Sequence, residues 1–318
     1  GMKKACRKAL TETLLELAKE NKKILTITSD ARGSVTLGDY AKEVPEQFVD
    51  AGIAEQNEVG VAAGAASCGL VSFVCAPAPF LSARSLEQIK VDVAYSNLNV
   101  KICAVSGGVS YGALGGSHHA VYDLAAIRPM ENITVLMPSD AAQTAWMTRQ
   151  IAEMEGPVYM RMGREPVDMI YNSEETGDFQ IGKAVKLREG TDLTVIAAGE
   201  MVSPSIQAAD ILAKENISVR VLDMHTIKPL DQQAILDAAK ETGRIVTVEE
   251  HCVLGGLGSA VAEFVVQNQA VSMKLLGIPD GHVVAGESDE VFQHYGLTPE
   301  GIAQSLREFL SCKEEVNG

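Results

Sequence analysis

Glu55 is the residue whose position most clearly indicates chemistry in this 318-residue chain. It follows Gly52-Ile53-Ala54 and precedes a run of small and apolar residues, 59–69, that carries no charged side chain. Such a run is typical of a helix packed closely against another surface, so we expect the carboxyl group at its entrance to be partly withdrawn from water. Because burial disfavours the charged form of a carboxyl group, Glu55 can give a strong hydrogen bond to a ring nitrogen or exchange a proton with it.

A structural explanation of Glu55 is also open. Acidic residues are favoured in the first turn of a helix because they interact with the positive end of the helix dipole. The choice between the two explanations depends on the motifs that accompany Glu55.

Four further motifs occur in an order that resembles the transketolase group of thiamine diphosphate enzymes. They are Thr28-Ser29-Asp30-Ala31, Phe80-Leu81-Ser82-Ala83-Arg84, Gly115-Gly116-Ser117-His118 and Met137-Pro138-Ser139-Asp140. The segment 52–69 resembles the pyrimidine-binding domain of that group, and the stretch 249–259 resembles a signature of its C-terminal domain. The match extends over nearly the full chain.

The resemblance implies roles for individual side chains. Glu55 would hydrogen-bond N1′ of the cofactor's aminopyrimidine ring and drive formation of the ylid, and Phe80 would stack on that ring. Asp30 belongs to the same cofactor-binding set. His118 matches a catalytic histidine that contacts cofactor and donor-sugar oxygens, where a side chain that titrates near neutral pH can relay a proton. His119 stands where the family usually has glutamine.

The resemblance also implies a site for the terminal phosphate of a sugar. Arg7, Ser34 and Arg164 match the family's phosphate ligands, and an arginine fork suits phosphate geometrically. Two positions depart from the family pattern: Leu114 replaces an acidic residue that reads a substrate hydroxyl, and Ser106 replaces a histidine. Because losing such a partner changes the discrimination between hydroxyl patterns, we expect a branched, deoxy or otherwise modified sugar phosphate to fit at least as well as ordinary pentose phosphates.

The chain lacks the Gly-Asp-Gly motif with which thiamine diphosphate enzymes hold the diphosphate and its divalent metal. The resemblance therefore implies the C-terminal half of a split transketolase. This chain would bind the pyrimidine end of the cofactor and no metal, and would be active only with an N-terminal subunit that carries the diphosphate-binding domain and Mg or another divalent metal. Family active sites form between subunits, so we expect a dimer or an α2β2 heterotetramer.

The expected reaction transfers a two-carbon ketol unit between sugar phosphates. Two enzymatic alternatives share this pair of domains, a deoxyxylulose-phosphate synthase and the β subunit of a 2-oxoacid dehydrogenase, and both would decarboxylate an oxoacid. A third alternative is a non-catalytic assembly subunit, against which the presence of Glu55, Phe80 and His118 argues.

Amphipathic helices alternate with short apolar strands in both halves of the chain. This pattern predicts two three-layer α/β domains, each a mostly parallel sheet with helices on both faces. We expect a pyrimidine-binding domain at 2–165, a linker at 166–180 and a C-terminal domain at 181–318. Strands are predicted at 24–28, 70–75, 100–106, 134–137, 158–160, 193–198, 218–223 and 244–248, and helices at 11–21, 203–215 and 231–241.

Composition supports a protein of the cytoplasm. The net charge of −15 argues against binding to nucleic acid or to an anionic membrane surface, and 46% hydrophobic residues are ample for two cores. No stretch is long and apolar enough for a membrane span, and the N-terminus lacks the pattern of a secretory signal. The six cysteines contain no Cys-x-x-Cys pair and are predicted to be mostly reduced core residues.

Overall fold

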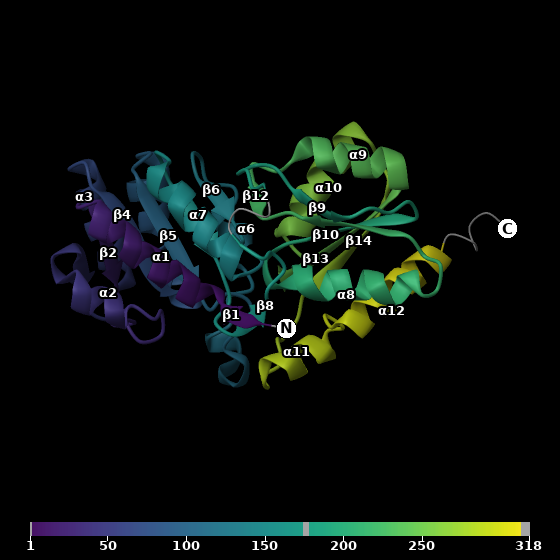
Figure 1. The fold of residues 1–318 in the computed structure, drawn as a ribbon, viewed down its shortest axis with the longest axis horizontal. Helices are drawn as coiled ribbons and strands as arrows, with labels where there is room; N and C mark the ends of the chain where they lie inside the picture. The colour runs from purple at the N-terminus through teal and green to yellow at the C-terminus, as the bar shows by residue number, and fades with distance from the viewer. Residues whose placement is uncertain (1, 174–177, 313–318) are drawn as a thin grey trace.

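The computed structural model describes residues 2–173 and 178–312, which form two α/β units side by side (Figure 1). The strands of the first unit are β1 (Lys3–Ala5), β2 (Ile24–Thr28), β3 (Phe48–Asp50), β4 (Val71–Pro77), β5 (Val100–Val105), β6 (Thr134–Leu136), β7 (Val158–Arg161) and β8 (Pro166–Asp168). Its helices are α1 (Cys6–Glu20), α2 (Gly38–Glu43), α3 (Glu55–Ser67), α4 (Ala78–Arg84), α5 (Leu86–Gln88), α6 (Asp123–Ile127) and α7 (Ala141–Glu153), with 3₁₀ turns η1 (Pro45–Gln47) and η3 (Gly112–Ser117) and a π-helix η2 (Ile89–Tyr95).

The second unit follows the same alternation. Its strands are β9 (Val185–Arg188), β10 (Leu193–Ala197), β11 (Val219–Asp223), β12 (Thr226–Lys228), β13 (Arg244–Cys252) and β14 (Ser272–Ile278). Its helices are α8 (Val202–Ala213), α9 (Gln232–Thr242), α10 (Leu257–Asn268), α11 (Ser288–His294) and α12 (Pro299–Ser311), with a 3₁₀ turn η4 (Gly199–Met201).

Both main sheets are mostly parallel. The larger has the strand order β12-β6-β7-β5-β4-β2-β3 and the smaller β14-β13-β10-β11-β9, while β1 and β8 form a separate antiparallel pair. Within the two main sheets only the edge strands β12 and β9 run antiparallel to their neighbours among the described residues. Two α/β domains with mostly parallel sheets were predicted from the sequence, and this prediction is confirmed.

Different helices cover the two faces of the larger sheet. On α1 the buried Cys6, Leu10 and Leu14 recur every fourth residue, so they lie on one side of the helix and share a core with α7. The opposite face is covered by α3, whose small residues permit a close approach to the sheet. The Ser72 hydroxyl on β4 accordingly donates to the carbonyl oxygen of Ala62 at 2.8 Å.

A continuous hydrophobic core joins the two units. It runs from Val59 on α3 through Ile127 on α6 to Ile235 on α9 and Val261 on α10. The other face of the smaller sheet packs against α8 and α12 in a separate core. The relative position of the units is therefore fixed by buried apolar surface as well as by the chain that connects them.

The connection between the units is more structured than the polar linker predicted at 166–180. Its first residues form β8, and the N–H groups of Ile170 and Tyr171 both donate to the Asp140 carboxylate at 2.8 Å. Residues 174–177 lie outside the described residues. Further along the chain, β12 returns from the second unit and pairs with β6 at the edge of the larger sheet.

The local predictions differ from the structure mainly at the ends of elements. The strand at 24–28 is confirmed at both ends, whereas the helix predicted from residue 11 begins at Cys6 and the strand predicted to end at 248 continues to Cys252. Four of the six cysteines are buried, and Cys68 and Cys312 are exposed, contrary to a core position for them. No helix in the described part of the chain is both long and apolar enough to span a bilayer.

Arg161 lies at the boundary between the two units with only 2% of its surface exposed. Its Nη2 donates to the carbonyl oxygens of Ala120 at 2.6 Å and of Glu250, in the second unit, at 2.8 Å. Its Nε lies 3.2 Å from Oδ2 of the buried Asp123. One guanidinium group thus ties together three segments that are far apart in the sequence.

Replacing Arg161 with methionine should lower the free energy of unfolding by about 3–5 kcal/mol, because the buried Asp123 would lose its counter-charge. The matched control is Arg307→Met on α12, which removes an ion pair with Glu215 at the surface and should leave the free energy of unfolding nearly unchanged. Urea denaturation followed by circular dichroism measures both. Equal losses in the two variants would contradict a special role for the buried group.

Candidate active site

Glu55 begins α3 and is 7% exposed, so its carboxyl group is withdrawn from water as the sequence predicted. The turn before it is held by Asp50, at the end of β3, whose Oδ1 accepts hydrogen bonds from the N–H groups of Asp30 at 2.8 Å and Gly52 at 3.0 Å. Gly52 has φ +75°, a backbone conformation that favours glycine. The Asp50 carboxylate therefore connects the Asp30 turn to the entrance of α3.

The Glu55 carboxylate has a partner on the neighbouring helix α4. Nη1 of Arg84 donates to Glu55 Oε1 at 3.0 Å. The same guanidinium lies over the ring of Phe80, with its central carbon 4.4 Å from the ring centroid. A hollow of about 520 Å³ opens beside these groups and is lined by residues 53–57 together with Arg84.

Phe80 also contacts His118, which comes from the loop after β5. Their ring centroids are 5.2 Å apart in an edge-to-face arrangement, and the His118 ring makes a second such contact with Tyr111 at 5.4 Å. Nδ1 of His118 lies 2.9 Å from the Ser117 hydroxyl. The loop can place His118 here because Gly115 adopts φ +68° and ψ −158°, a conformation that is essentially restricted to glycine.

Two arginines continue the site beyond Tyr111. The guanidinium carbon of Arg164 lies 4.9 Å from the Tyr111 ring centroid, and Nη1 of Arg7 donates to the carbonyl oxygen of Ser34 at 2.7 Å. Burial and, second, the positive charge of Arg164 lower the pKa of Arg7. The Nε groups of Arg7 and Arg164 have no hydrogen-bond partner within the described residues. Arg164 Nε lies 3.6 Å from Oε1 of the exposed Glu165, which offsets part of the positive charge. Two guanidinium groups beside one acidic side chain still suit an anion.

The structure thus brings together most of the residues that the sequence singled out. A run of contacts leads from Glu55 through Arg84, Phe80, His118 and Tyr111 to Arg164. Arg7, which binds the Ser34 carbonyl oxygen, lies near enough for the charge of Arg164 to lower its pKa. Asp30 is exposed, has φ +53°, and is connected to this run only through the Asp50 turn.

The bridging residues Arg84, Tyr111 and Asp50 were missed by the sequence analysis. Arg84 ends the motif Phe80-Leu81-Ser82-Ala83-Arg84, but nothing in the sequence spacing identified Glu55 as its partner. Tyr111 and Asp50 lie in a loop and at a strand end, where no local periodicity marks them.

The positions that depart from the family pattern lie in different surroundings. Leu114 is 56% exposed, so within this chain it does not line a buried pocket. Ser106 is buried, has φ +60°, and its hydroxyl has no partner among the described residues. His119 turns toward the second unit, where its Nε2 lies 3.3 Å from the carbonyl oxygen of Val284. Burial lowers the pKa of His119.

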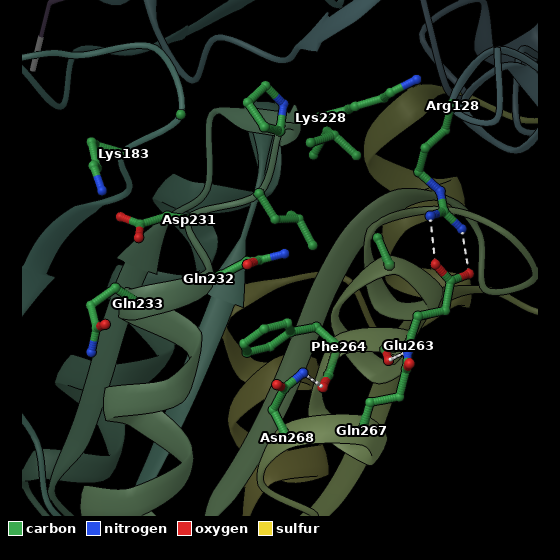
Figure 2. Close-up of a pocket in the computed structure, with 15 residues that line it drawn as sticks. Arg128, Lys183, Lys228, Asp231, Gln232, Gln233, Glu263, Phe264, Gln267 and Asn268 are labelled. Carbon is green, nitrogen blue, oxygen red and sulfur yellow. Dashed lines mark hydrogen bonds and ion pairs between the residues drawn. The ribbon is translucent and has the colours of Figure 1, made fainter. Parts of the chain in front are cut away.

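A second, polar hollow of about 870 Å³ lies between β12 and helices α9 and α10 (Figure 2). Four of its charged side chains, those of Arg128, Lys228, Asp231 and Glu263, have partners within the chain. Arg128 forms a two-point ion pair with Glu263 at 2.7 and 2.8 Å, Lys228 donates to a backbone carbonyl, and Asp231 accepts from two backbone N–H groups. No predicted site residue lines this hollow in the described part of the chain, so we place the chemistry at Glu55 instead.

Two family models match the chain. The transketolase pyrimidine-binding domain matches residues 2–168, and the transketolase C-terminal domain matches residues 182–302. The chain belongs to the transketolase family. Within it the chain corresponds to the C-terminal half, which some organisms encode as a separate subunit.

Relatives of similar length support this correspondence. One of the subunits of the apulose-4-phosphate transketolase of Phocaeicola vulgatus is 53% identical over 96% of this chain and 97% of that protein. A putative transketolase C-terminal section of Methanocaldococcus jannaschii is 42% identical over 97% of both chains. A solved split-gene transketolase, an inactive β4 tetramer, superimposes with a TM-score of 0.86 at 38% identity, over 96% of this chain and 98% of that one.

Longer enzymes match over about half their length. The 1-deoxy-D-xylulose-5-phosphate synthase 1 of Geobacter sulfurreducens is 37% identical over 95% of this chain but only 47% of that protein. The Campylobacter jejuni transketolase shares the fold, with a TM-score of 0.80 at 18% identity over 97% of this chain and 47% of that one.

Glu58 lies one helical turn after Glu55 and is completely buried. Neither of its carboxyl oxygens has a hydrogen-bond partner among the described residues. Burial raises the pKa of Glu58 to about 8, with smaller upward contributions from the charges of Glu55 and Asp50 and an opposing one from Ser29. Glu58 is therefore an acid that the fold holds neutral near pH 7.

A raised carboxyl pKa destabilises the folded state increasingly as pH rises from the unfolded pKa to the folded one. We therefore expect Glu58→Gln, which is neutral at every pH, to raise the free energy of unfolding by about 1–3 kcal/mol at pH 8.5 and by much less at pH 5.5. Urea midpoints at both pH values measure this. The exposed Glu46, whose pKa is lowered, serves as control, since Glu46→Gln should give no gain at pH 8.5. A Glu58→Gln gain that is the same at both pH values would refute the interpretation.

Proposed function

We propose that this chain is the C-terminal subunit of a split, thiamine diphosphate-dependent transketolase that transfers a two-carbon ketol unit between sugar phosphates. The observation that carries the proposal is the run of contacts from Glu55, a buried carboxylate, to Arg164, whose positive charge lies close enough to Arg7 to lower its pKa. A ring-binding group and a phosphate-binding group at the two ends of one surface match the two molecules that a transketolase must hold together.

The residues around Glu55 fit the pyrimidine end of the cofactor. They already hold a flat group with nitrogen donors, since the Arg84 guanidinium covers Phe80 and donates to Glu55. We assign Glu55 to hold or exchange the proton at N1′ of the ring, Phe80 to its face, and Asp30 to the turn beside it. When bound, the cofactor supplies the electron sink for breaking and forming the carbon–carbon bond.

The other end of the surface is assigned to the sugar. His118, between Phe80 and Tyr111, faces the reacting oxygens and can pass a proton there, while Arg7, Arg164 and Ser34 bind the terminal phosphate. One relative is named as a subunit of an apulose-4-phosphate transketolase, and another, 36% identical, as a subunit of a 6-deoxy-6-sulfo-D-fructose transketolase. We propose a substrate of this kind, modified in its carbon skeleton and anionic at its end.

The remaining half of the active site is assigned to a partner. We propose an N-terminal subunit that holds the diphosphate and its Mg or other divalent metal, assembled with this chain as a cytoplasmic α2β2 heterotetramer. Within this chain we assign 2–165 to the pyrimidine-binding domain, 166–180 to the linker and 181–318 to the C-terminal domain. In this division β12 is a strand of the C-terminal domain that extends the sheet of the pyrimidine-binding domain.

Decarboxylation of an oxoacid is the second candidate function, because deoxyxylulose-phosphate synthases match this chain at 35–38% identity. Such an enzyme also binds a sugar phosphate, so the phosphate group alone does not separate the two reactions. The donor does: a ketose phosphate for a transketolase, and pyruvate for a synthase.

Glu55→Gln keeps the shape of the side chain but removes its ionisable group. In the complex reconstituted with the N-terminal subunit and Mg, we expect ketol transfer to slow by roughly 10²–10⁴, because a catalytic proton partner is lost. Assembly, followed by size-exclusion chromatography, should persist. The control Glu215→Gln changes an exposed acid in the second unit that pairs with Arg307 and should leave the rate unchanged. Near-normal turnover of Glu55→Gln would support the structural explanation instead, in which Glu55 only interacts with the positive end of the helix dipole.

Arg164→Ala should lower kcat/KM for phosphorylated sugars by about 10- to 150-fold, the equivalent of one charge-assisted contact, and should hardly change it for an unphosphorylated analogue. The control Arg188→Ala removes an ion pair in the second unit, with Asp210. The assay uses a panel of pentose, deoxy and branched sugar phosphates together with pyruvate. Efficient decarboxylation of pyruvate without ketol transfer from any sugar would replace the transketolase proposal with the second candidate.

A further inference from the structure

The Arg84 side chain already occupies the two groups that the proposed function assigns to the cofactor's pyrimidine ring. It donates to Glu55 Oε1 at 3.0 Å and covers the Phe80 ring, with 4.4 Å between the guanidinium carbon and the ring centroid. A guanidinium is planar, delocalised and carries N–H donors at its edge. In shape and hydrogen bonding it therefore matches the ring that these residues would bind.

We propose that Arg84 is a placeholder for the cofactor ring: it fills the ring site of the unloaded subunit and has to turn away when the ring enters. This inference rests on the proposed function and adds to it a residue that controls access to the cofactor site. A ring that stacks on the face of Phe80 where Arg84 lies, and that bonds to Glu55, needs both positions that the Arg84 guanidinium now occupies. Such a ring and the observed position of Arg84 therefore exclude each other.

The need for a placeholder follows from the burial of Glu55. The Glu55 carboxylate is 7% exposed, and an ionised group at that depth is unfavourable without a partner. Within the described residues Arg84 supplies the hydrogen bond that Glu55 accepts from a side chain. When the cofactor binds, the nitrogen N1′ of its pyrimidine ring would replace Arg84 as the hydrogen-bond partner of Glu55.

The contacts that hold Arg84 over Phe80 and on Glu55 are weak enough to be broken when the ring binds. The Arg84 side chain is 52% exposed, and ion pairs and cation–π contacts at such exposure are weak. Its removal from the ring site therefore weakens cofactor binding by only about 5- to 10-fold relative to an empty site. A buried arginine such as Arg161 could not be displaced in this way.

The surroundings also offer Arg84 a second position. Its side chain separates the hollow beside Glu55 from another of about 740 Å³ on its other side. The second hollow is lined by Glu131, by Glu87 and by Lys90, which pairs with Glu87. When the ring enters, the guanidinium can therefore exchange the Glu55 carboxylate for that of Glu131.

The test is the affinity of the reconstituted complex for thiamine diphosphate, measured by isothermal titration calorimetry in the presence of Mg. Arg84→Met keeps a long side chain but removes the charge, the plane and the donors, so we expect the Kd to fall by about 5- to 10-fold. Arg84→Lys, which keeps the charge without the plane, should give a smaller decrease. The matched control is Arg307→Met, which removes a cation from a partly exposed ion pair with Glu215 in the second unit and should leave the Kd unchanged.

An unchanged or higher Kd for Arg84→Met would overturn the placeholder and leave the proposed function intact. A wild-type complex that binds no thiamine diphosphate would overturn both. Crystal structures of the wild-type complex with and without cofactor provide a readout that does not depend on any variant. In the complex without cofactor, we expect the Arg84 guanidinium to lie over Phe80. In the complex with cofactor, we expect it to be no longer bonded to Glu55. An Arg84 that stays bonded to Glu55 in the complex with cofactor would rule out the placeholder role.

Discussion

The buried guanidinium of Arg161 is the contact on which both the joint between the domains and the active-site loop depend. One of its acceptors, Ala120, also forms a β-bridge with Gly108, and these two residues enclose the loop that carries His118. A side chain at Gly107 would overlap Arg161, and one at Gly108 would overlap Glu250. The loop can therefore close only because two glycines leave room for a buried arginine and a buried glutamate.

The acidic residues around Arg161 show how the C-terminal domain contributes to this arrangement. Burial raises the pKa values of Glu249 and Glu250, and the charge of Arg161 opposes the rise in both. Glu249 accepts hydrogen bonds from the N–H groups of Leu257 and Gly258, so it caps the start of α10. The stretch 249–259, which resembles a family signature, thus has a structural explanation. Glu249 orders a helix of its own domain, and Glu250 accepts a hydrogen bond from the N–H group of Val109 in the other domain.

Features encoded by neighbouring residues could be read from the sequence, and features that depend on distant partners could not. The strand 24–28 is a short apolar run with clear ends and was identified correctly. The run of small residues 59–69 likewise predicted a closely packed helix with Glu55 withdrawn from water at its start, and Glu55 begins α3 and is buried. β12 was missed because three residues have no measurable periodicity and its hydrogen bonds go to β6 in the other domain. The resemblance to a known family located His118 and Arg164, but only the folded chain reveals that Tyr111 connects them.

The candidate site is ordered before any partner covers it. The Asp50 carboxylate fixes the turn before Glu55, and Gly115 fixes the bend before His118, so neither group depends on another chain for its position. Yet Ile53, two residues from Glu55, is 77% exposed, and Leu114, four residues from His118, is 56% exposed. Covering these apolar side chains with another surface would be favourable, because it removes them from water. The N-terminal subunit proposed above would be that surface, so the same contact that completes the cofactor site would also bury the apolar residues beside it.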